Sequence, residues 1–119
     1  MSVWDEAPKN TQAVFEHLKM LARLMRTAPY GEIAAAIGLK EDREIAPISL
    51  RFPLAFVRDT ICRPGGLPWL NALAVSAATG LPGESFLPAG VAFGDDDRVL
   101  WRGAVLAVFG YPWESVRVG

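Results

Sequence analysis

The side chains that could perform chemistry in this sequence are few and lie far apart. Cys62 is the only cysteine and His17 the only histidine among 119 residues, so these two cannot form a disulfide or a zinc site by themselves. A thiol also needs a basic or cationic neighbour to become a strong nucleophile, and only Arg63 stands beside Cys62. We therefore expect a buried structural cysteine, a solvated histidine, and no catalytic residue, metal or cofactor.

Two other patterns carry a structural meaning more readily than a chemical one. Asp95–Asp97 could bind a cation, but three aspartates ahead of an apolar run are typical of a helix start, where they complement the helix dipole. The segment Gly80–Gly83 has too few glycines for a phosphate-binding loop and indicates a turn. Because no Ser/His/Asp set or metal-ligand spacing accompanies them, we predict that the protein is not an enzyme.

The composition indicates one folded domain over residues 1–119. Hydrophobic residues make up 51% of the chain and charged residues 21%, which is enough apolar material for a core. The formal net charge of -1 argues against a strongly basic nucleic-acid binder, although a local basic patch is compatible with it. The N-terminus lacks a signal pattern and no apolar run is long enough for a membrane span, so we expect a cytoplasmic protein without membrane contact.

Hydrophobic spacing predicts three helices in the first half of the chain. The first covers about residues 11–26, with Thr11 as its N-cap, and the second is a short helix within residues 30–39, where Gly38 can take the left-handed cap. The third begins with Pro53 in its first turn and runs to about Arg63. The buried stripes consist of Val14, Leu18, Leu21 and Met25 in the first helix and Leu54, Val57 and Ile61 in the third. This arrangement places Arg51 and Arg58 on an exposed face of the third helix.

The second half of the chain predicts strands before a final helix. We expect a strand over residues 69–77, with Leu73 and Val75 in the core and with Trp69 and Asn71 at its mouth as candidates for contact. A turn at Thr79–Gly83 and a second strand near 84–87 or 91–93 would complete a β-hairpin. A helix then follows Asp95–Asp97 and ends at Gly110, after which Trp113 and Val116 pack the tail on the body. The order helix, short helix, helix, β-hairpin, helix predicts an α+β domain of the winged helix-turn-helix type.

The stretch YGEIAAAIGL, residues 30–39, resembles a known DNA-binding family. In the C-terminal winged-helix domain of DNA alkyltransferases and alkyltransferase-like proteins, a Tyr-Gly-Glu-Leu-Ala pattern leads into the helix-turn-helix. Leu67-Pro68-Trp69 stands where that family has Pro-Cys-His-Arg or Pro-Trp-His-Arg, and the helix ending Val108-Phe109-Gly110 matches its closing helix. The resemblance covers about residues 11–113 in element order and is an analogy at the level of the fold.

The resemblance implies DNA binding without alkyl transfer. Trp69 takes the place of the reactive cysteine, and Leu70 and Asn71 replace the His-Arg pair that activates it. In the family, a tyrosine of the first motif helix disturbs the phosphate at the target base, and an arginine of the next helix fills the gap. Tyr30 matches that tyrosine, Arg58 or Arg51 would be the arginine, and Trp69 would line a base pocket.

Two functions therefore stay open at this point. The first is a non-catalytic winged-helix module that binds DNA or RNA through Tyr30, Arg51, Arg58, Trp69 and Asn71. Such binding would be weak and salt-sensitive, because residues 40–63 carry five cations against four anions. The alternative is a protein-interaction or assembly module that retains the fold without DNA binding. Four tryptophans and six phenylalanines supply its potential anchors, and residues 84–119 are acidic, which suits a protein partner better than DNA.

Overall fold

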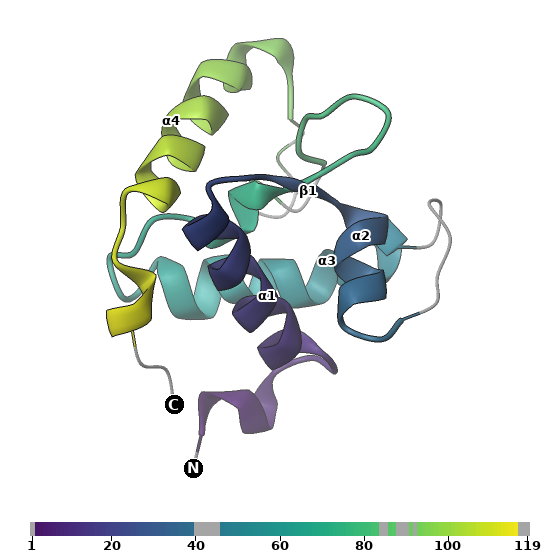
Figure 1. Ribbon diagram of the computed structural model, residues 1–119, viewed down its shortest axis with the longest axis vertical. Helices are drawn as coiled ribbons and strands as arrows, with labels where there is room; N and C mark the ends of the chain where they lie inside the picture. The colour runs from purple at the N-terminus through teal and green to yellow at the C-terminus, as the bar shows by residue number, and fades with distance from the viewer. Residues whose placement is uncertain (1, 40–45, 84–85, 88–90, 92, 117–119) are drawn as a thin grey trace.

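The computed structural model describes residues 2–39, 46–83, 86–87, 91 and 93–116, with 46–48 described by their backbone alone. The described residues form a mixed α and β domain, so the predicted class is confirmed at this level. Its main elements are α1 (Thr11–Leu24), β1 (Ala28–Pro29), α2 (Tyr30–Ala36), α3 (Ala46–Phe56), β2 (Ala74–Val75) and α4 (Arg98–Phe109). Figure 1 shows α1 crossing α3 near the centre, α2 beside one end of α3, and α4 on the opposite side of the molecule.

Helix α1 forms close to the predicted range, but its two ends differ from the prediction. Asn10 and Met25 have positive φ angles of 72° and 55°, and they bracket the helix in the left-handed conformation. Thr11 is therefore the first helical residue and not the N-cap, and its hydroxyl donates to the Pro8 carbonyl at 2.6 Å. The stripe of Val14, Leu18 and Leu21 is buried as predicted. Met25 is exposed because the helix has already ended at Leu24.

The short helix α2 and its left-handed Gly38 agree with the sequence, whereas α3 begins earlier than predicted. Pro53 lies inside α3 and not in its first turn, which Pro47 occupies instead. Proline cannot donate to the carbonyl four residues back, so it weakens the regular α-helical ladder at this point. The helix then continues as the π-helical turn η2 (Val57–Cys62), in which the Arg63 N–H bonds the Arg58 carbonyl at 3.0 Å. The predicted core residues Leu54, Val57 and Ile61 are all buried.

The predicted strand over residues 69–77 is wrong for most of its length. Leu70–Leu73 form the 3-10 helix η3, and only Ala74 and Val75 are extended as β2. These two residues pair in parallel with β1, with Ala28 opposite Ala74 and Pro29 opposite Val75. The apolar run in the sequence did not distinguish the two conformations, because a 3-10 turn and a strand can each bury such a run. Leu73 and Val75 are buried as predicted.

The described residues do not form the predicted β-hairpin. Ser76–Leu81 is a tight loop in which the Ser76 N–H bonds the Leu81 carbonyl at 2.9 Å and Gly80 has a φ of +70°. Of the two predicted return strands, residues 84–85 and 92 lie outside the described residues, and Phe86 and Leu87 form a bend. The strand pairing that is described connects β2 to β1 and not to a later strand.

The start of α4 and the C-terminal tail agree with the sequence. Asp95–Asp97 form the 3-10 turn η4 that leads into α4, and the Asp97 carboxylate accepts from the Gly94 N–H at 2.9 Å. Trp113 is buried and donates its indole N–H to the Val108 carbonyl at 2.7 Å, so the tail packs back as predicted. No helix within the described ranges is long and apolar enough to cross a bilayer.

Candidate functional site

An open groove of about 490 Å³ lies between α4 and the segment around Trp69. Its lining side chains are apolar or absent, and they come from two directions: Pro68, Trp69 and Phe86 on one side, and Val99, Leu100, Gly103, Ala104 and Ala107 of α4 on the other. Val99 is 81% exposed and Leu100 57% exposed. The groove therefore presents aliphatic and aromatic surface directly to solvent.

The phase of α4 explains why its apolar surface stays open. Trp101, Val105 and Val108 face the body, and the Trp101 indole donates to the Ala72 carbonyl of η3 at 2.9 Å. A second series at the same helical spacing, Leu100, Ala104 and Ala107, faces the groove. One stripe is sufficient to attach α4 to the body of the domain, so the second stripe is not buried by folding.

Aromatic stacking forms the wall of the groove opposite α4. The Phe86 ring lies edge-on to the Trp69 ring at 5.9 Å between centroids, and the Phe93 ring lies at the same distance from Phe86. Asn71 fixes the position of this wall, because its side-chain amide donates to the Phe86 carbonyl at 3.2 Å. Asn71 is buried, so its predicted place at the exposed mouth of a strand is wrong.

Arg58 is also buried, with 2% of its surface exposed, and its predicted exposure is wrong. Its guanidinium contacts both Asp59 carboxylate oxygens at 2.7 Å and donates to the Leu87 carbonyl. This hydrogen bonding from Arg58 is the main cause of the lowered pKa of Asp59, with a smaller contribution from Arg63. Arg58 and Asn71 thus hold the consecutive carbonyls of Leu87 and Phe86, and both act as positioning residues for the aromatic wall.

Tyr30 serves the fold in a similar way. It is buried at the start of α2, and its hydroxyl accepts from the Gly83 N–H at 2.7 Å. A Cβ at Gly83 would lie 2.9 Å from that hydroxyl, so the loop approaches the ring as closely as a glycine allows. This contact ties the loop after β2 to α2, and it leaves little of Tyr30 to contact an external phosphate.

Arg51 is the one predicted cation that is exposed. Its guanidinium lies 5.0 Å from the centre of the Phe52 ring, and 61% of Phe52 is exposed. Arg51 does not line the groove. The five predicted site residues therefore do not form one surface: Trp69 lines the groove, Arg58 and Asn71 lie beneath its wall, Tyr30 fixes a loop, and Arg51 stands on α3.

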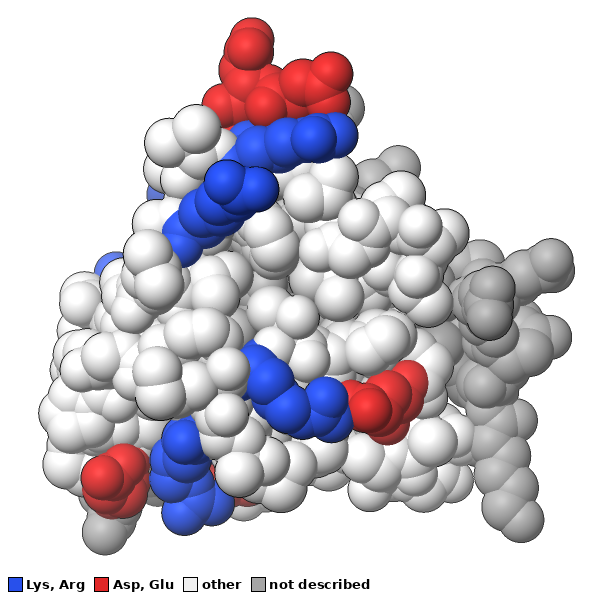
Figure 2. All heavy atoms as spheres, turned by 45° about the horizontal axis from the view of Figure 1, so that its top comes forward, with Lys and Arg blue, Asp and Glu red and all other residues white. Residues whose placement is uncertain are grey.

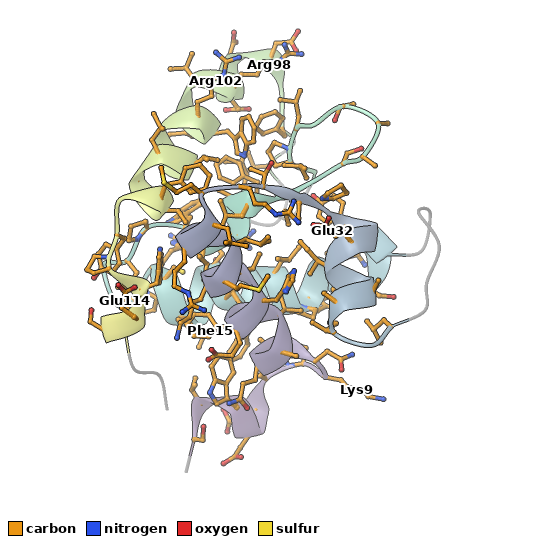
Figure 3. The ribbon with its side chains drawn as sticks, in the orientation of Figure 1. Lys9, Phe15, Glu32, Arg98, Arg102 and Glu114 are labelled. Carbon is orange, nitrogen blue, oxygen red and sulfur yellow. The ribbon has the colours of Figure 1, made fainter. Side chains whose placement is uncertain are left out.

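Several of the described surface charges lie next to a charge of opposite sign. Arg98 contacts Asp95 at 3.3 Å, and Arg26 contacts Glu32 at 2.6 Å. In the view of Figure 2, the acidic group at the top adjoins basic side chains, and lower on this face blue and red side chains lie next to each other. Figure 3 identifies Arg98 and Arg102 at this end of α4 and Glu114 beyond the other. The face drawn in Figure 2 thus lacks a continuous basic band among its described residues.

Neither of the two chemically reactive side chains takes part in the groove. Cys62 is buried as predicted, and burial raises the pKa of its thiol to about 11, which keeps it protonated near neutrality. His17 is half-buried and not simply solvated, and its Nε2 has no hydrogen-bond partner among the described residues. Burial lowers the pKa of His17, Glu32 opposes this change, and Arg26 adds to it. Within the described ranges, His, Cys, Asp and Glu side chains form no group that could hold a metal ion.

The groove residues of α4 were missed by reasoning from the sequence, although a signal was present. Apolar or small side chains occupy positions 99, 100, 101 and 103–109, which exceeds the single stripe of a surface helix. Such a helix is either buried on several sides or exposes apolar surface. The sequence could not decide between these cases, because the neighbours of α4 are set by distant segments.

No family model matches this chain, and no curated protein or solved structure matches it either. The likeness of residues 30–39 to the alkyltransferase motif therefore stays a prediction. The groove is the most specific indication of function that the described residues provide.

Proposed function

We propose that this domain is a non-catalytic protein-interaction module that binds apolar side chains of a partner protein in the groove between α4 and Trp69. The observation that carries the proposal is the exposure of Val99 and Leu100 beside the aromatic pair Trp69 and Phe86. Contiguous exposed apolar surface of this kind marks interaction sites in soluble proteins. Tryptophan in a partly enclosed pocket is also a frequent hot spot of protein interfaces.

The chemistry of the lining favours a protein over a nucleic acid at this site. Recognition of a base edge needs hydrogen-bonding side chains, and recognition of the backbone needs cations near the phosphates. The groove residues supply apolar contacts instead. Transfer of a partner's apolar side chains from water into the groove would be favourable by roughly 25 cal/mol per Å² of surface buried.

A neutral amphipathic peptide tests this proposal directly. We would titrate the ¹⁵N-labelled domain with a synthetic helix of about 14 residues that has a leucine stripe and glutamine elsewhere. We expect amide shift changes to cluster on Trp69 and on residues 99–107. Changes centred on Arg51 and Phe52, or no changes at all, would contradict the proposal.

Two leucines of nearly equal exposure provide a matched pair of variants. Leu100 lines the groove and is 57% exposed, whereas Leu24 at the end of α1 is 59% exposed and lies outside the groove lining. Loss of one buried leucine contact is worth about 1.5 kcal/mol, so Leu100→Ser should weaken peptide binding about tenfold. Leu24→Ser should leave it unchanged. Equal effects of the two substitutions would indicate nonspecific adsorption to apolar surface.

Nucleic-acid binding is the second candidate, and the pair formed by Arg51 and Phe52 favours it. An exposed guanidinium beside an exposed ring can contact a phosphate and stack on a base at once. Binding at this one place would be weak, with a shallow salt dependence, because few counterions are released. Titration with a short single-stranded and a short double-stranded oligonucleotide tests it, and Arg51→Ala should abolish any shift changes that appear.

We also propose a winged-helix arrangement and a cytoplasmic location for the domain. The order of α1, α2, α3 and α4 is compatible with a winged helix. Its wing would have to come from residues 76–94, part of which lies outside the described ranges. An experimental structure with an antiparallel hairpin in this segment would support that finer assignment, and a segment without one would contradict it.

A further inference from the structure

We infer that the occupant of the groove is an amphipathic helix that carries an acidic side chain on the side lying beside Trp69. This inference rests on the proposed function and specifies the partner of the same groove. It follows from the shape of α4, from the apolar lining and from the cation beside Trp69.

The shape of the α4 side suits a helix. Gly103, Ala104 and Ala107 line the groove with little or no side chain, and a Cβ at Gly103 would meet no atom within 4 Å. Small residues let two helix axes approach closely, and ridges of larger side chains on one helix pack into the groove that they leave on the other. With 12 residues, α4 is about 18 Å long, which matches three turns of a partner helix.

The charge beside Trp69 comes from Arg63. Its guanidinium lies 6.0 Å from the centre of the Trp69 ring, and about half of its side chain is exposed. Its contact with Asp59 is long, at 3.4 Å, and Arg58 engages both oxygens of that carboxylate more closely, at 2.7 Å. Arg63 therefore retains most of its capacity to pair with an acid from outside.

The other charges near α4 are placed differently. Arg98 and Arg102 each lie two residues from Leu100, and residues two apart point to nearly opposite sides of a helix. Figure 3 shows them at the N-terminal end of α4, next to the acidic turn Asp95–Asp97. An acid on the partner would meet repulsion from that turn and attraction at Arg63, so the charges favour an acid on the side of the groove where Trp69 lies.

The experiment compares two labelled peptides of about 14 residues that share one leucine stripe and carry either glutamate or lysine at both ends. Fluorescence anisotropy at low ionic strength gives their affinities for the native domain. We expect the glutamate peptide to bind about fivefold more tightly, which is the range of a partly exposed ion pair. High salt should reduce this preference, since exposed charges are screened.

Charge reversal assigns the preference to a residue. Arg63→Glu should invert it, Arg63→Gln should remove most of it, and Arg23→Glu on the exposed side of α1 should leave it unchanged. The glutamine variant keeps the test valid if the reversed charge beside Asp59 impairs folding. Circular dichroism of each variant checks that the fold is intact.

The outcomes separate this inference from the proposed function. If both peptides bind equally, or if the preference survives Arg63→Glu, the inference is wrong while groove binding stands. If binding of either peptide is insensitive to Leu100→Ser, the groove is not the site and the proposed function fails with the inference. A preference for the lysine peptide would assign the groove to a basic helix and overturn the inference.

Discussion

Helices α1 and α4 have similar lengths, 14 and 12 residues, yet they use their apolar side chains in opposite ways. In α1 the apolar stripe of Val14, Leu18 and Leu21 is completely buried against neighbouring elements. In α4 only Val105 and Val108 are buried, while Val99, Leu100 and Leu106 are more than half exposed. The first helix uses its hydrophobic surface for folding, and the second keeps much of it available.

The neighbours of the two helices account for this difference. Helix α1 crosses α3 and also packs on η3, so its apolar stripe is covered by two elements. Helix α4 is attached along one edge through Trp101 and η3. Its remaining apolar edge faces the rings of Trp69 and Phe86 across an open groove. Hydrophobic residues of the same type therefore stabilise the fold in α1 and, in our proposal, bind a partner in α4.

The largest expected effect comes from truncating one leucine in each helix. Leu18→Ala removes a completely buried side chain of α1 and should lower the free energy of unfolding by about 2–5 kcal/mol. Leu100→Ala in α4 removes a half-exposed side chain and should cost at most about 1 kcal/mol. Urea denaturation of both variants measures the difference. Equal losses would show that the groove side of α4 belongs to the core, and the comparison would break down.

The two arginines of the third helical segment should differ almost as much. Arg58→Ala removes the donor to the Leu87 carbonyl and the partner of Asp59, so we expect a loss of about 3 kcal/mol. Arg51→Ala should change stability by less than about 0.5 kcal/mol, because Arg51 is exposed. The same denaturation experiment compares them. A harmless Arg58→Ala would remove our explanation of how the aromatic wall of the groove is held.

Local patterns in the sequence were sufficient to predict that these helices exist, but not where α3 begins. The spacing of Val14, Leu18 and Leu21, the left-handed Gly38 and the acidic start of α4 predicted elements that the structure contains. Helical spacing also predicts the burial of Arg58. It stands four residues after Leu54 and three before Ile61, which places it on the buried side of its helix. It was misplaced because an arginine is rarely buried without a partner, and its acceptor at Leu87 is 29 residues away.

Distant contacts determined the features that the sequence could not supply. The run after Trp69 contains apolar residues that suit a strand, but the pairing of β2 with β1 covers only Ala74 and Val75. Pro53 looked like a helix start because α3 begins within a charged and proline-containing segment that has no clear signal of its own. The groove itself depends on how α4 meets Trp69, which no local spacing encodes.

A smaller effect is expected from two glycines, one inside α4 and one in the loop that contacts Tyr30 of α2. Gly103 lies inside α4 with open space around its missing Cβ, so Gly103→Ala should stabilise the domain by roughly 1 kcal/mol through helix propensity. Gly83→Ala should destabilise it, because the new methyl group would press on the Tyr30 hydroxyl. Thermal unfolding of both variants checks these signs. A destabilising Gly103→Ala would mean that α4 packs against something on its groove side.

The smallest expected effect is a pH dependence from His17 on the partly buried edge of α1. Burial lowers the pKa of His17 in the folded protein below the ordinary value of 6.5, which the unfolded chain retains. Between these two pKa values the unfolded state binds more protons than the folded state, so stability rises with pH through this window. Acidification below 6.5 should therefore weaken the fold, and the loss should stop growing once the pH is below the folded pKa.

Asp59 adds a loss of the same sign only at lower pH, since its lowered pKa contributes stability above 3.8 that disappears on further acidification. Urea midpoints measured across this range should fall less in His17→Gln than in the native protein. Parallel curves for the two proteins would mean that His17 is as accessible to protons in the folded state as in the unfolded one.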